Sequence, residues 1–142
     1  MVVPKEPGFY LKDGSPCKYA DSKQISANRY VLQHDLTYRA KNGSFYTVRA
    51  GFTHDGASKG FLRHFGKYTN AAILHDALYG IQYRRSTADS LFLEAMKVSG
   101  VGWFRRKLYW SIVRAAGWSA FNGKSEETVR KNKQYLMIWS KD

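Results

Sequence analysis

The sequence NAAILHDALYGIQYRRSTADSLFLEAMKVSG, residues 70–100, decides the fold because it contains two helical segments joined by a short basic turn. In the first segment, His75 shares a helical face with apolar residues such as Leu78 and Tyr79. In the second segment, Asp89 is followed by apolar residues three, four and seven positions later. This spacing places a carboxylate on the face that we expect to be buried.

The turn lies at almost equal distances from the two polar groups. His75 precedes Gln82 by seven residues, and Asp89 follows Gln82 by seven. An antiparallel helix pair would therefore bring His75 and Asp89 to the same level, within hydrogen-bonding distance. A histidine held by a buried carboxylate is the basic unit of a general base.

A second interpretation of Asp89 needs no chemistry. Ser86-Thr87-Ala88-Asp89 matches the capping-box pattern, in which Ser86 caps the second helix and Asp89 accepts a hydrogen bond from a backbone N–H. The two roles are not exclusive, because a carboxylate has two oxygens.

The clearest β pattern lies in residues 29–50, where apolar and polar residues alternate on both sides of Asn42-Gly43. A three-residue loop, Lys41-Asn42-Gly43, sets apolar residues opposite each other: Tyr38 opposite Tyr46 and Leu36 opposite Val48. We therefore predict a hairpin with this loop. His34 falls on the apolar face, which favours a hydrogen-bonded histidine in the core over a functional one.

These patterns predict a single α+β domain over residues 1–142. We expect an N-terminal antiparallel hairpin or small sheet, then an antiparallel helix pair, then a third helix. The parts are a β-rich region, a functional loop, a helical region and a basic tail (1–50, 51–69, 70–121 and 122–142). The third helix, residues 103–117, should bury a face with Phe104, Leu108, Ile112 and Ala115 and stop at Gly117. In the tail, residues 135–139 could add an edge strand or dock as a tail.

Charge is the main feature of the composition. The net charge is +12, from 23 Lys and Arg against 11 Asp and Glu, which predicts an anionic partner: a phospholipid surface, nucleic acid or an acidic protein. The single cysteine excludes an intrachain disulfide and suits a reducing compartment or a virion. The start of the sequence is not a signal peptide, and no apolar run has the length of a membrane span. We expect the host cytoplasm or the virion.

Three blocks of the sequence resemble, in order, a family of phage and prophage proteins, domain-of-unknown-function family 1353. The shared pattern is GF-x-x-D-G-A-S, then A-A-x-L-H-D-x-L-Y, then A-D-x-x-F. The blocks begin in this chain at Gly51, Ala71 and Ala88. The resemblance implies a phage origin, and with it other virion proteins as partners.

The helix pair also has a looser similarity to phospholipases A2, which carry H-D-x-x-Y and a later A-D-x-x-F/L. This similarity implies that His75 is the general base, that Asp89 orients it and that Tyr79 helps to hold the dyad. It also implies that Asp76 binds calcium, with backbone carbonyls of the preceding loop and Asp55 as further ligands. The chain lacks the stapling cysteines and the glycine-dense calcium loop of those enzymes.

Three classes of function follow. The favoured interpretation is a small basic phage component, virion-associated or host-directed and non-catalytic, in which the His75–Asp89 pair is a structural hydrogen bond. The first alternative is a calcium-dependent, phospholipase A2-like lipid or ester hydrolase. The second is a nucleic-acid-binding module driven by the positive charge.

Overall fold

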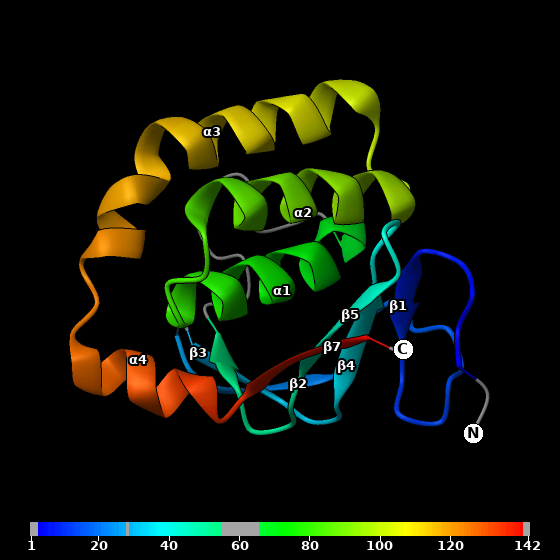
Figure 1. The fold of residues 1–142 in the computed structure, drawn as a ribbon, viewed down its shortest axis with the longest axis horizontal. Helices are drawn as coiled ribbons and strands as arrows, with labels where there is room; N and C mark the ends of the chain where they lie inside the picture. Colours follow the sequence, from blue (N-terminus) through cyan, green and yellow to red (C-terminus); the bar gives the residue numbers. More distant parts are fainter. Residues whose placement is uncertain (1–2, 28, 55–65, 141–142) are drawn as a thin grey trace.

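The computed structural model describes residues 3–27, 29–54 and 66–140 (Figure 1). Its architecture is α+β, as predicted: antiparallel strands come first, and the helices follow. The helices are η2 (Gly66–Tyr68, a 3-10 turn), α1 (Thr69–Gly80), α2 (Arg85–Val98), α3 (Trp103–Asn122) and α4 (Glu126–Lys133). None of the helices in these ranges combines the length and the apolar character that a membrane span requires.

The strands form two antiparallel sheets. They are β1 (Gly8–Tyr10), β2 (Ser22–Ser26), β3 (Arg29–Leu32), β4 (Leu36–Arg39), β5 (Ser44–Val48), β6 (Thr53–His54) and β7 (Leu136–Ser140). The larger sheet has the order β1-β4-β5-β7, and the smaller sheet has the order β2-β3-β6.

The β4–β5 hairpin confirms the predicted loop. Tyr38 lies opposite Tyr46 and Leu36 opposite Val48. Gly43 has a φ of +89°, the left-handed conformation that the last residue of such a loop requires. The hairpin therefore has the predicted register and buries its apolar face.

The alternating run that contains His34 is not one strand, and the prediction of a core histidine is wrong. β3 ends at Leu32 and belongs to the smaller sheet, whereas β4 starts at Leu36 in the larger one. His34 lies in the connection, exposed, with Nε2 4.0 Å from Asp21 Oδ2. Leu32 and Leu36 are buried on either side of this connection, so His34 is exposed because it lies between the two sheets and belongs to neither.

The helices α1, α2 and α3 stack in layers on one side of the sheets (Figure 1). α1 packs on β5 and β6 and on α2, and α2 in turn packs on α3. Because α1 is covered from several sides, ten of its residues are buried, and Asp76 is half-buried. A helix enclosed in this way is apolar around most of its surface, as the run of Ala, Ile and Leu in its sequence requires.

The segment after α3 contains a fourth helix and a strand, so the prediction of three helices is wrong. Ser125 Oγ caps α4 by accepting a hydrogen bond from Thr128 N at 3.2 Å. Two glutamates in the first turn and three cations in the last turn complement the helix dipole. β7 then pairs with β5, with Leu136 opposite Val48, as one of the two roles expected for residues 135–139.

Two further predictions about helix ends are wrong. α2 begins at Arg85, one residue before Ser86, and no side chain caps it. α3 continues through Gly117 to Asn122. The prediction of the buried face of α3 is also wrong, because Phe104 and Leu108 are exposed and Tyr109 is buried instead.

Candidate functional site

The antiparallel pair of α1 and α2 brings His75 and Asp89 together, as the spacing predicts. His75 Nε2 lies 2.7 Å from Asp89 Oδ1. Asp89 is 0% exposed and His75 is 7% exposed. The carboxylate is therefore not a cap of α2 but a buried acceptor between helices.

Tyr79 completes the contact on the α1 side. It lies four residues after His75, so the two rings share a helical face and their centroids are 4.1 Å apart. The Tyr79 hydroxyl donates a hydrogen bond to Asp89 Oδ1 at 2.6 Å. The same carboxylate oxygen thus accepts from both α1 side chains.

The second oxygen of Asp89 faces cations that sequence reasoning missed. Arg114 Nη1 donates to Asp89 Oδ2 at 2.9 Å, and Arg85 Nε lies 4.0 Å from the same oxygen. Arg85 Nε also donates to the Tyr79 hydroxyl at 3.2 Å. Arg85 precedes Asp89 by four residues on one helix, a pattern that could have revealed it. Arg114 lies on α3 and gave no local signal.

α3 approaches this cluster closely because residue 117 is a glycine. A Cβ atom at Gly117 would lie 2.9 Å from the Tyr79 hydroxyl oxygen. The Tyr79 ring also packs edge-on against Phe121, with the centroids 5.2 Å apart. Two Arg85 hydrogen bonds, to the carbonyls of Val113 and Arg114, hold the helix there.

The surroundings set the protonation of the cluster. Burial raises the pKa of Asp89, but hydrogen bonds from His75, Tyr79 and Arg114 outweigh it and hold this pKa below its ordinary value. Burial and the hydrogen bond to Asp89 raise the pKa of Tyr79 to about 12, although Arg85 lowers it. At neutral pH, Asp89 is therefore a carboxylate, and Tyr79 keeps its proton.

An ionised Asp89 fixes the tautomer of His75. The carboxylate has no proton to give, so Nε2 must carry the hydrogen of the 2.7 Å bond. In the neutral ring, the lone pair is then on Nδ1. Within the described ranges, Nδ1 makes no hydrogen bond. The ring lies against Phe92, with centroids 4.7 Å apart, and is held rigidly as a proton acceptor.

Only one of the two carboxylates predicted to bind calcium belongs to the described residues. Asp76 follows His75 on α1 and is half-buried, whereas Asp55 lies outside the described residues. The described part of the chain holds no group of three or more His, Cys, Asp or Glu residues that could bind a metal. Asp55 and most of the loop that should supply the other oxygen ligands fall outside the described ranges, so the calcium site stays a prediction.

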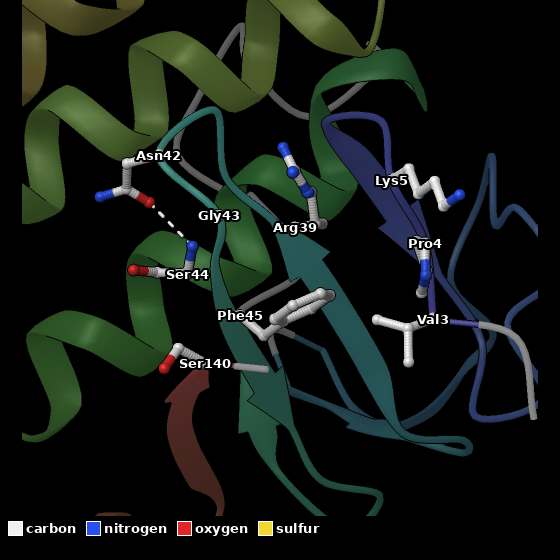
Figure 2. Close-up of a pocket in the computed structure, with 9 residues that line it drawn as sticks. All are labelled: Val3, Pro4, Lys5, Arg39, Asn42, Gly43, Ser44, Phe45 and Ser140. Carbon is white, nitrogen blue, oxygen red and sulfur yellow. Dashed lines mark hydrogen bonds between the residues drawn. The ribbon is translucent and has the colours of Figure 1, made fainter. Parts of the chain in front are cut away.

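A cavity of about 330 Å³ lies elsewhere, between the N-terminal segment, the β4–β5 hairpin and the end of β7 (Figure 2). Its lining includes Lys5 and Arg39 and the hydroxyl-bearing Ser44 and Ser140. None of the lining residues belongs to the His75 cluster. The cavity and the cluster are therefore separate features.

Comparison with known proteins places the chain in one family. The family model described as "Protein of unknown function (DUF1353)" matches residues 30–113, which include His75, Asp89 and the start of α3. No curated protein and no solved structure matches the chain. The match covers more than half of the 142 residues, and the chain belongs to the DUF1353 family.

Proposed function

We propose that this protein is an ester hydrolase of the phospholipase A2-like type, with His75 as its general base. The observation that carries the proposal is the hydrogen bond from His75 Nε2 to the buried, ionised Asp89, because it leaves the lone pair on Nδ1. Asp89 and Tyr79 are positioning residues that fix the tautomer and the ring.

The reaction needs one proton transfer in each direction. Nδ1 takes a proton from a water molecule as the water oxygen attacks the ester carbonyl, and a tetrahedral oxyanion forms. The positive imidazolium is stabilised by the Asp89 carboxylate 2.7 Å from Nε2. When the oxyanion collapses, the C–O bond breaks and Nδ1 returns the proton to the leaving alkoxide. The products are a fatty acid and a lysophospholipid.

Phospholipid is the proposed substrate class for two reasons. The helix pair resembles that of phospholipases A2, and the net charge of +12 would concentrate the protein on anionic lipid. The same resemblance implies calcium dependence. Calcium is tested as a variable in the assay.

The test is fatty-acid release from mixed vesicles of phosphatidylcholine and phosphatidylglycerol, with calcium and with a chelator. We expect His75→Ala to lower the rate by about 10²–10⁴-fold, the range of general-base contributions, with an unchanged circular dichroism spectrum. Ser90→Ala is the matched control, because Ser90 is an exposed neighbour of Asp89 on α2. No release by the wild type in either condition would refute the hydrolase.

A non-catalytic phage component, virion-associated or host-directed, is the second candidate, and a specific observation favours it. Asp89 is paired with Arg114 and Tyr79 as well as with His75, so the same cluster joins α1, α2 and α3 without any reaction. In this case His75→Ala would lower the melting temperature and change no activity. Mass spectrometry of purified particles would then detect the protein in the virion.

A further inference from the structure

The outer face of α3 carries an apolar stripe that no part of the described chain covers. Positions 104, 108, 111, 115 and 118 recur every three or four residues and so lie along one side of the helix. All five are exposed, and three are large and apolar: Phe104 is 71% exposed, Leu108 is 40% exposed and Trp118 is 58% exposed. Trp103, at the start of the helix, is also exposed.

The opposite side of α3 does the packing. Tyr109 is buried in the core, and Val113 packs against it. The outer stripe is therefore not needed for the fold. α3 is also the outermost helix of the stack, on the side away from the sheets (Figure 1). Several large apolar side chains exposed along one face of a helix are a candidate interaction surface.

The charges beside the stripe have one sign. Arg105 and Lys107 flank it and are exposed. α3 contains no aspartate or glutamate, and the chain as a whole has a charge of +12. Lys107 Nζ lies 6.0 Å from the centroid of the Trp110 ring on the same helix, at the outer limit of a cation–π contact.

An anionic membrane fits this combination better than other partners do. Tryptophan, phenylalanine and leucine on a helix with flanking Lys or Arg are the groups that enter the headgroup region. A second copy of the chain would bring like charges together. A nucleic acid would contact the apolar stripe first, whereas its phosphates need contacts with cations.

We propose that the outer face of α3 binds anionic phospholipid membranes, with Phe104, Leu108 and Trp118 in the interface and Lys107 on headgroup phosphates. The helix lies flat on the lipid, over a length of about 30 Å. The binding surface does not use His75, so the inference goes beyond the proposed hydrolase and does not depend on it.

The first experiment is co-sedimentation with vesicles of phosphatidylcholine alone and of phosphatidylcholine with an equal amount of phosphatidylglycerol. We expect binding to the anionic vesicles, with a blue shift of tryptophan fluorescence. Phe104→Ser should weaken the partition coefficient by about tenfold or more, from the lost burial of one aromatic side chain. Ile25→Ser is the matched control, because Ile25 is 56% exposed on β2, far from α3 (Figure 1).

The second experiment tests the charges. Lys107→Glu should weaken binding to anionic vesicles and reduce its salt dependence, whereas Lys23→Glu on β2 should lower binding much less. All of these residues are exposed, so the variants should keep the wild-type circular dichroism spectrum. The His75→Ala variant should bind as the wild type does, which separates membrane binding from turnover.

Three results would overturn the proposal. Equal binding of Phe104→Ser and wild type would show that the stripe does not enter the membrane. Equal binding to neutral and anionic vesicles would exclude the role of the cations. Binding of duplex or single-stranded DNA that Phe104→Ser weakens, without binding to vesicles, would assign the face to nucleic acid instead.

Discussion

Gly117→Ala is the sharpest test of how α3 sits against the helix pair. The new Cβ atom would lie 2.9 Å from the Tyr79 hydroxyl oxygen, a distance that requires a shift. The hydroxyl cannot move easily, because it donates to Asp89 Oδ1 at 2.6 Å and accepts from Arg85 Nε at 3.2 Å. The substitution therefore strains the centre of the candidate site.

The magnitude follows from two opposing effects. Replacing glycine by alanine inside a helix ordinarily stabilises it by about 1 kcal/mol. Overpacking of a well-filled contact costs about 1–3 kcal/mol. We therefore expect Gly117→Ala to lower the free energy of unfolding by about 0–2 kcal/mol, opposite in sign to the effect at an open helical position.

Urea unfolding of a double-mutant cycle measures this effect. In a Tyr79→Phe background the hydroxyl is gone, and the nearest remaining ring carbon is 3.3 Å from the added Cβ. Gly117→Ala should then become neutral or stabilising, with a coupling energy of about 1–2 kcal/mol. Ala115→Gly, at an exposed position of α3, gives the intrinsic difference between the two residues. Equal stabilisation by Gly117→Ala in both backgrounds would refute the packing described here.

Three further substitutions test the cluster and the N-terminal segment. Arg114→Met should lower the free energy of unfolding by about 1–3 kcal/mol in urea titrations. The loss should be smaller than for a wholly buried partner, because solvent reaches the arginine. An unchanged free energy of unfolding would mean that Arg114 does not compensate the charge of Asp89. The pKa of Asp89 is lower in the folded chain than its ordinary 3.8, so its stabilisation is present above that pH and is lost as the pH falls through the folded pKa. Thermal melts of Asp89→Asn should therefore show lower stability at neutral pH and a smaller loss in acid, and parallel pH profiles would contradict this. Asn70→Ala removes the hydrogen bonds that the amide donates to Cys17 O and Lys18 O and the one that it accepts from Ala20 N. Limited proteolysis should therefore cut near residue 20 faster than in the wild type, and an unchanged rate would contradict this.

The helix pair and the hairpin could be predicted because local rules determine both. The equal spacing of His75 and Asp89 from Gln82 sets their level once the helices are antiparallel. The left-handed Gly43 sets the register of the hairpin in the same way. Such features depend on a few neighbouring residues, so the local sequence is enough to predict them.

Features that depend on distant segments could not be predicted. The buried side chain of Asn70 binds the backbone of residues 17–20, about fifty positions earlier in the chain, and no local pattern indicates this contact. Arg114 lies twenty-five positions after Asp89, on another helix, and no spacing rule connects them. The fourth helix, in contrast, does have a local signal, because Ser125 followed by two glutamates is a typical helix start. The basic composition of the segment led to its interpretation as a tail.

The buried face of α3 illustrates how a polar group can decide between two apolar faces of a helix. Each face carries three large apolar side chains: Phe104, Leu108 and Trp118 on the exposed face, and Tyr109, Val113 and Phe121 on the face toward the core. Turning that stripe inward would require roughly half a rotation of the helix. The rotation would remove Arg114 from Asp89 and turn Gly117 away from Tyr79. A buried carboxylate without its cation is destabilised by several kcal/mol, about the gain from burying two apolar side chains. The need of Asp89 for a partner thus selects the inner face and leaves the apolar stripe available for a membrane.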